Sequence, residues 1–358
     1  MSTQNLFGKI QTVLGAIDSN ALGITLPHEH LLIDLASWFQ DVSEPTEKKL
    51  ANEPLKLDNL WWVKTHSYSN LDNLKLDDEE LAIKEALMFK NAGGNSIVDL
   101  TNIGLARNPL ALARISKATG LNIIMGSGYY IGASHPPELA NMTEQEVTQK
   151  IIHDIVDGVD KTGVHAGIIG EIGCSDPLYD EECKVLRAAA AAQRATGAPL
   201  NIHPSTTDDL ALEIITILNT ADANLSHTII SHVDQWGFHY DTCRRLATAG
   251  CFIEFDSFGN EGIYLNHQDN TLTQYAQDDV LLVKRIVELI SEGYIAQLLI
   301  SCDVCLKQLL ASYGGYGYAH ILRAIVPVLR WSGLSYEQIN TLLIDNPKRA
   351  FSFTTPKL

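Results

Sequence analysis

Two histidines, two residues apart, close the first apolar run of the chain at Leu26-Pro27-His28-Glu29-His30. Side chains two apart on a strand point to the same face, so both imidazoles can reach one metal ion. The alternative is a structural role for two polar residues at a strand-to-loop corner. Evidence from the rest of the sequence is needed to decide between these interpretations.

Four further metal-capable side chains stand near the ends of other apolar runs: Glu171, His203, His232 and Asp303. Glu171 lies in the apolar segment 167–173, where a lone carboxylate is costly unless it has a partner. A buried salt bridge is the alternative, but no basic residue lies in or beside this segment. A carboxylate with two oxygens can instead bridge two cations.

The elements that must position these side chains alternate between short β-type runs and amphipathic helical segments, as in a parallel sheet of βα units. The predicted strands are Leu22–Leu26, Ser96–Thr101, Asn122–Ser127, Ala166–Ile172, Pro199–His203, Thr228–His232, Cys251–Asp256 and Leu298–Asp303. The predicted helices are Asp78–Asn91, Pro109–Thr119, Glu144–Val159, Asp180–Thr196, Asp208–Asn219, Tyr240–Ala249, Asp278–Glu292 and Tyr318–Trp331. Eight such units without a Pro/Ser-rich linker predict an α/β protein, a single (β/α)₈ TIM barrel over residues 1–358.

The metal-capable side chains all fall at the carboxyl ends of the predicted strands, the face where such barrels place their active sites. His203 or His232 alone is more simply explained as a structural histidine. As a pair at matched heights on neighbouring strands, they are better explained as ligands of a second metal ion. The sequence therefore predicts a metal centre at this face. Imidazole and carboxylate ligands suit zinc, manganese, cobalt and iron alike.

Two segments interrupt the alternation, at about 37–75 after the first strand and at 257–277 after the seventh. Both are βα loops on the predicted active-site face, and loops of this length are usually functional. A solvated excursion is the alternative for much of the first segment.

The chain has a formal net charge of −17 and is 46% hydrophobic, with no cluster of lysine or arginine. Nucleic acid and anionic membrane surfaces are therefore poor partner candidates, and a small-molecule substrate is favoured. We find no signal peptide and no run of 18 apolar residues. Six cysteines are too sparse for a disulfide framework, so the sequence predicts a cytoplasmic protein.

In this order the ligands resemble those of the phosphotriesterase family of the amidohydrolase superfamily, and most closely its phosphotriesterase-related (parathion hydrolase-related) branch. The resemblance runs from about Gly8 to Phe351. The phrases that carry it are Gly23-Ile24-Thr25-Leu26-Pro27-His28-Glu29-His30, the segment Gly167 to Gly173, Phe255-Asp256-Ser257-Phe258-Gly259, Tyr313-Gly314-Gly315-Tyr316-Gly317-Tyr318 and Asn346-Pro347-Lys348-Arg349.

The resemblance implies two divalent metal ions per chain, with zinc expected and manganese, cobalt or iron as alternatives. It makes His28, His30 and Asp303 ligands of the more buried ion and His203 and His232 ligands of the more exposed one. The strand-four carboxylate bridges the two ions. In the name-giving phosphotriesterases this bridge is a carbamylated lysine, whereas here it is the shorter Glu171, as in the related branch. This difference puts phosphotriesterase activity in doubt.

The implied reaction is hydrolysis by a metal-bridging hydroxide, with Asp303 as the catalytic proton acceptor. The leading hypothesis is cleavage of a small amide, ester or lactone, including an N-acyl amide that carries an anion. The alternatives are an organophosphate triesterase and a catalytically silent barrel that binds a metal or a ligand. The family also makes a homodimer an expectation.

Several residues on the rim of the predicted site are candidates for substrate binding: Tyr129, Tyr130, Trp236, Glu261, Tyr264 and Lys307. The aromatic residues could equally pack the top of the barrel. Lys307 could bind a substrate anion, and its alternative is a solvated lysine at a helix start.

Overall fold

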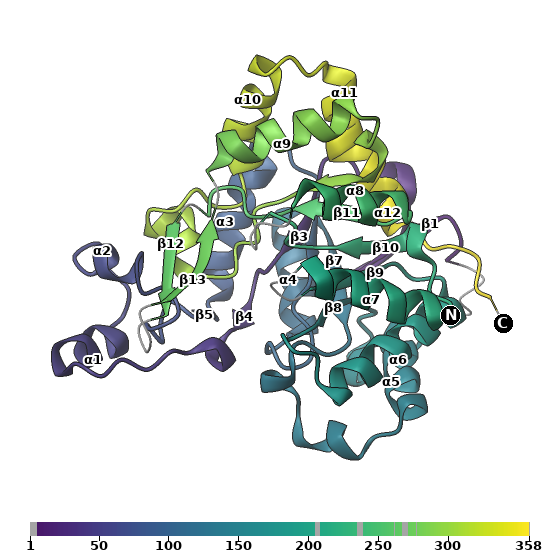
Figure 1. Ribbon diagram of the computed structural model, residues 1–358, viewed down its shortest axis with the longest axis horizontal. Helices are drawn as coiled ribbons and strands as arrows, with labels where there is room; N and C mark the ends of the chain where they lie inside the picture. Colours follow the sequence, from purple (N-terminus) through teal and green to yellow (C-terminus); the bar gives the residue numbers. More distant parts are fainter. Residues whose placement is uncertain are drawn as a thin grey trace.

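Eight parallel strands form a nearly closed barrel surrounded by helices (Figure 1). The computed structural model describes residues 6–204, 208–234, 239–260, 262–266, 271–276 and 278–357. In their order around the sheet the strands are β14 (Leu298–Ile300), β11 (Phe252–Phe255), β10 (Thr228–Ile230), β9 (Leu200–His203), β8 (Ile168–Gly173), β7 (Asn122–Ser127), β6 (Ser96–Asp99) and β3 (Thr25–Glu29). The predicted TIM barrel is therefore confirmed.

The helices outside the barrel are α3 (Glu79–Asn91), α4 (Pro109–Thr119), α5 (Glu144–Val156), α6 (Asp180–Thr196), α7 (Asp208–Thr220), α8 (Tyr240–Thr248), α9 (Asp279–Ser291), α10 (Val326–Trp331), α11 (Tyr336–Asn340) and α12 (Asn346–Phe351). Helices α3 to α9 begin and end close to the predicted residues, whereas α10 begins later than predicted and α11 and α12 were not predicted. Local chemistry sets these bounds: the Asn108 side chain caps the first turn of α4, and Gly120 ends it at a φ of 67°. No helix in the described ranges is both long and apolar enough to cross a bilayer.

The core has two layers, because successive residues of a strand point to opposite sides of the sheet. Ile97 belongs to the large apolar cluster between the sheet and the helices, whereas its neighbour Val98 belongs to the smaller cluster inside the barrel. The inner cluster also contains Ile10, from strand β1 (Lys9–Thr12), and Phe351, from α12. β1 pairs with β2 (Gly15–Asp18), and Phe353 forms backbone hydrogen bonds with Gly8 and Lys9.

The side chain of Glu29 joins the first and last barrel strands. Its Oε1 accepts hydrogen bonds from Ser301 Oγ at 2.8 Å and from the backbone N–H of Cys302 at 2.9 Å. Its Oε2 accepts from the backbone N–H of Val304 at 2.9 Å. Asp303 N donates to the carbonyl oxygen of His28 at 3.3 Å. Side chains thus supply much of the closure between β3 and β14.

The first barrel strand begins later than predicted, at Thr25 instead of Leu22, and it includes His28. Leu22 packs instead in the inner cluster. The apolar run before His28 did not mark the strand correctly. The strand continues into polar residues, whose buried side chains are hydrogen-bonded to residues on or just after other strands. The last predicted helix also differs, since a π-helical turn at Ile321–Ile325 precedes α10.

Both predicted insertions contain regular structure. The first holds α1 (Pro45–Asn52) and α2 (Leu60–Val63), and the short strands β4 (Ile33–Asp34) and β5 (Lys75–Leu76) pair at its base. Val42, Ala51, Leu55, Leu60, Trp62 and Val63 give this insertion a small core of its own, so it is not a solvated excursion. The second contains the antiparallel strands β12 (Gly262–Asn266) and β13 (Thr271–Ala276). In Figure 1 both insertions extend from the side of the barrel opposite the chain termini.

Candidate metal centre

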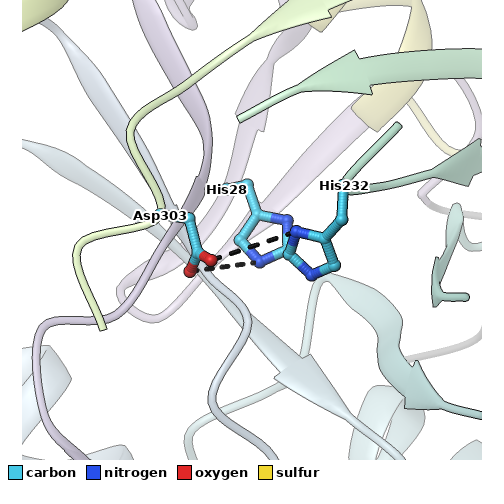
Figure 2. Close-up of side chains that lie close together, drawn as sticks. All are labelled: His28, His232 and Asp303. Atoms are coloured by element: carbon cyan, nitrogen blue, oxygen red, sulfur yellow. Dashed lines mark ion pairs between the residues drawn. The ribbon is translucent and has the colours of Figure 1, made fainter. Parts of the chain in front are cut away.

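All six predicted metal ligands lie together at the carboxyl ends of the barrel strands, and each is at most 6% exposed. Glu171 is central, because its Oε2 lies 3.4 Å from His28 Nε2, from His203 Nδ1 and from His232 Nε2. Asp303 Oδ1 lies 3.3 Å from His30 Nε2 and 3.7 Å from His28 Nε2. Figure 2 shows Asp303 facing the imidazoles of His28 and His232.

Three of the four imidazoles are oriented by a hydrogen bond on Nδ1. The partner of His28 Nδ1 is Glu254 Oε2 at 3.1 Å, and that of His30 Nδ1 is Thr101 Oγ1 at 2.9 Å. His232 Nδ1 is bonded to Asp256 Oδ1 at 2.9 Å. Such partners fix the tautomer of a metal-binding histidine and leave Nε2 available as the ligand.

The spacing of the ligand atoms fits bound divalent ions. Zinc bonds to nitrogen and oxygen of about 2.0–2.2 Å place two ligands of one tetrahedral ion roughly 3.4 Å apart. The observed separations of 3.3–3.7 Å match this value. Within the described residues, His28 Nε2 and His203 Nδ1 are buried and have no hydrogen-bond partner. A bound cation would satisfy both atoms, so the residues present fit a metal site.

The cluster also holds its carboxylates in the charged form that binds metal. Burial alone would raise the pKa of Glu171, but the imidazoles of His203, His232 and His28 lower it well below its usual range. The pKa of Asp303 is likewise lowered, against the effect of burial, by its contacts with imidazoles, that of His30 first. Burial lowers the pKa of His203, which keeps its imidazole neutral and able to donate a lone pair.

Two of the ligands have left-handed backbone conformations, with φ of 57° at His232 and 45° at Asp303. Such conformations cost a non-glycine residue on the order of 1–3 kcal/mol and persist only where the surroundings impose them. At His232 they are imposed by Asp256, whose Oδ2 accepts the backbone N–H at 2.9 Å while its Oδ1 binds the ring. The strained backbone therefore aims the side chain into the cluster.

Comparison with known proteins agrees with this geometry. The family model described as "Phosphotriesterase family" matches residues 8–351. An N-acetyltaurine hydrolase from Xenopus tropicalis is 40% identical, covering 98% of this chain and 99% of the relative. The human N-acetyltaurine hydrolase is 37% identical, with coverage of 98% and 99%. The chain belongs to the phosphotriesterase family.

Solved structures of similar proteins support this membership. A resiniferatoxin-binding protein from Rhodobacter sphaeroides superposes with a TM-score of 0.93 at 36% identity, and the match covers 98% of both chains. A lactonase from Listeria monocytogenes gives a TM-score of 0.78 at 25% identity, covering 97% of this chain and all of that one. Together with the named relatives, these make the protein a hydrolase of the phosphotriesterase family.

A pocket opens above the cluster. Its polar lining consists of ligand residues, and the remainder is apolar or aromatic. The lining residues are His30, Ile33, Leu35, Trp38, Tyr68, Leu105, Tyr130, Glu171, His203, His232, Asp303 and Cys305.

Of the predicted substrate-binding residues, Tyr130 is the one that the structure places in this pocket. Its ring meets the imidazole of His203 edge-on, with centroids 4.9 Å apart. The ring of Tyr129 lies against His135 instead, and its hydroxyl donates to Met142 Sδ at 3.9 Å. Trp236 and Glu261 lie outside the described residues, and Tyr264 lies on β12, where no side chain is described.

Lys307 is not brought to the pocket. It is 8% exposed, and its Nζ donates to Asp72 Oδ1 at 2.6 Å, within the first insertion. Its backbone N–H donates to the carbonyl oxygen of Asn73 at 2.9 Å. The structure therefore places Lys307 as an anchor between the loop after β14 and the first insertion, rather than as a substrate-binding cation.

Several residues of the site were missed from the sequence. Trp38 and Tyr68 come from the first insertion, and the length of this loop was the only signal for them. The carboxylates that support the histidines, Glu254 and Asp256, lie on or just after β11. Their position at the end of a predicted strand was a usable signal, because acidic residues there must pair with something buried.

Proposed function

We propose that this protein is a dinuclear-metal hydrolase that cleaves small N-acyl amides, with N-acetyltaurine as the first substrate to test. The observation that carries the proposal is the complete six-residue cluster centred on Glu171, at the base of a small aromatic pocket. The relatives named N-acetyltaurine hydrolase support it, because their similarity extends over nearly the whole chain.

In this proposal His28, His30 and Asp303 hold one ion, His203 and His232 hold the other, and Glu171 lies between them. Two such ions, zinc first and manganese, cobalt or iron as alternatives, supply Lewis acidity and an activated water. The protein's own groups then act on the substrate. Asp303 is ionised at neutral pH, because the neighbouring imidazoles lower its pKa, and in this proposal it is also the group that accepts the proton.

Tyr130, in contrast to Asp303, keeps its proton. Burial, with the nearby charges of Glu171 and Asp303, raises the pKa of its phenol well above the usual range. The hydroxyl is therefore a hydrogen-bond donor at any physiological pH, suited to orient a substrate oxygen. The aromatic and aliphatic walls limit water beside it, which strengthens such polar contacts.

A lactone is the second candidate substrate, because a similar solved structure is named a lactonase. A lactone presents the same acyl carbonyl to the metal centre. A bulky phosphotriester needs a wide apolar pocket, and a pocket lined by Trp38, Tyr68 and Tyr130 next to the metal ligands is a poor match for it. The side chain of Glu171 is also shorter than the carbamylated lysine of the name-giving phosphotriesterases, which again argues against a phosphotriester substrate.

The test is kcat/KM of zinc-loaded and manganese-loaded protein for N-acetyltaurine, a γ-lactone and a neutral phosphotriester, with metal content measured on the same samples. We expect N-acetyltaurine to be the best of the three. A γ-lactone as the best substrate would favour the second candidate. The phosphotriester as the best substrate would overturn the proposal, as would hydrolysis of none by protein carrying two ions per chain.

A further inference from the structure

The anionic end of an N-acyl substrate meets no cationic side chain in the described lining of this pocket. The described lining contains neither lysine nor arginine. The undescribed segments cannot supply one either, because residues 1–5, 205–207, 235–238, 261–277 and 358 contain neither type. Lys307 is occupied by Asp72. If the proposed function holds and the metal ions bind the acyl end of the substrate, its sulfonate or carboxylate is left to neutral donors.

Trp38 carries a neutral donor beside this pocket. Its ring lines the pocket, and within the described residues its buried Nε1 has no hydrogen-bond partner. A buried N–H without a partner is costly, so an orphaned donor of this kind needs an explanation. His203 Nδ1, in the same pocket, is orphaned in the same way and is explained by a metal ion. In the same way, a ligand bound in the pocket would accept a hydrogen bond from the indole N–H of Trp38.

The position of Trp38 is fixed from two sides. Its backbone N–H donates to the carbonyl oxygen of Leu35 at 2.9 Å, and Leu35 N in turn donates to Leu74 O at 2.9 Å. Its ring packs against Tyr68, with centroids 5.9 Å apart, and lies 6.4 Å from the ring of His203. The indole is therefore held next to a predicted metal ligand by contacts that do not use its N–H.

We propose that the indole N–H of Trp38 donates a hydrogen bond to the anionic end of the substrate and so determines specificity for N-acyl amides that carry a sulfonate or carboxylate. An indole is a donor only, so it does not compete for the metal ions and does not repel an anion. The first insertion then contributes directly to substrate selection. This inference rests on the proposed amidase function.

The test compares Trp38→Phe with the wild type on N-acetyltaurine and N-ethylacetamide, which share the acetamide and differ in the sulfonate. Phenylalanine keeps an aromatic ring but removes the N–H. We expect KM for N-acetyltaurine to rise roughly 10- to 150-fold, the value of a hydrogen bond to a charged group, with little change in kcat. The kcat/KM for N-ethylacetamide should fall much less than that for N-acetyltaurine, because N-ethylacetamide has no anionic group to bind. Trp61→Phe, in the same insertion but 68% exposed, is the matched control and should change neither.

Each outcome is decisive. An equal loss on both amides, or no loss on either, overturns the role of Trp38 while the amidase function stands. Failure of the metal-loaded wild type to cleave either amide overturns the proposed function and this inference with it. If Trp38→Phe does not fold, as judged by circular dichroism, Trp38→His keeps a ring N–H and should retain the preference for the sulfonate. Loss of that preference in folded, metal-loaded Trp38→His would contradict the inference.

Discussion

Glu171 is the residue whose oxygen approaches three imidazoles at once, each at 3.4 Å. Its carbonyl oxygen is held as well, by a hydrogen bond from the side-chain amide of Asn102. The side chain thus has a fixed position and a lowered pKa, which suits a bridge between two cations. Removal of the carboxylate would leave like charges facing each other across the centre.

We therefore expect Glu171→Ala to lose bound metal and activity together. Loss of a partner that only supports a ligand costs 10–100-fold, so removal of the bridge should lower kcat/KM by more than about 100-fold. Glu171→Gln keeps one acceptor oxygen and the shape of the side chain, and should harm activity more than folding. Elemental analysis, kinetics and thermal unfolding measure the three effects. Glu80→Ala, an exposed change on α3, serves as the control. Full activity in Glu171→Ala would remove this residue from the site.

Among the elements, the junction of β3 and β14 depends on one buried carboxylate more than on a ladder of backbone hydrogen bonds. Glu29 accepts three hydrogen bonds, from Ser301, Cys302 and Val304, which are the residues on either side of Asp303. The same contacts that close the barrel therefore hold a predicted metal ligand in place. Burial raises the pKa of Glu29 to about 7 despite these hydrogen bonds.

For this junction we predict that Glu29→Gln lowers the free energy of unfolding by about 1–3 kcal/mol, because an amide cannot accept all three hydrogen bonds. The pH dependence has a defined sign. Protonated Glu29 is favoured by the fold, so its contribution is fully present below the unfolded pKa near 4.5 and is lost as pH rises toward 7. Urea unfolding of metal-free protein between these pH values should show a smaller decrease in stability for Glu29→Gln than for the wild type. An identical pH dependence would contradict the assignment.

The elements also show what sequence could and could not predict. The helix at Pro109–Thr119 was predicted to the residue, because Asn108 and Gly120 are local signals that mark its ends. The first strand was misplaced, because His28 and Glu29 are buried through partners more than 200 residues away in sequence. The six ligands were found because strand ends converge in a barrel. The pocket-wall residues Trp38 and Tyr68 were not predicted, because the path of the first insertion depends on its own small core.

At the scale of the whole molecule, the fold and the family are settled, whereas the predicted homodimer, the cytoplasmic location and the lack of nucleic-acid and membrane partners stay predictions. The barrel and the first insertion supply different parts of the site. The barrel supplies the ligands and the carboxylates that orient them. The first insertion supplies Trp38 and Tyr68, so exchange of this segment between relatives is a natural route to new substrates.

The lack of lysine and arginine in the pocket has a kinetic consequence when it is combined with a net charge of −17. An anionic substrate would approach a protein whose net charge repels it, and no lysine or arginine in the described lining of the pocket offsets this repulsion. Dissolved salt shortens the reach of the repulsion to about 10 Å at 0.1 M. We expect kcat/KM for N-acetyltaurine to increase with ionic strength, while that for uncharged N-ethylacetamide stays constant. A decrease for N-acetyltaurine would show that the substrate is attracted electrostatically, as by an entrance lined with cations.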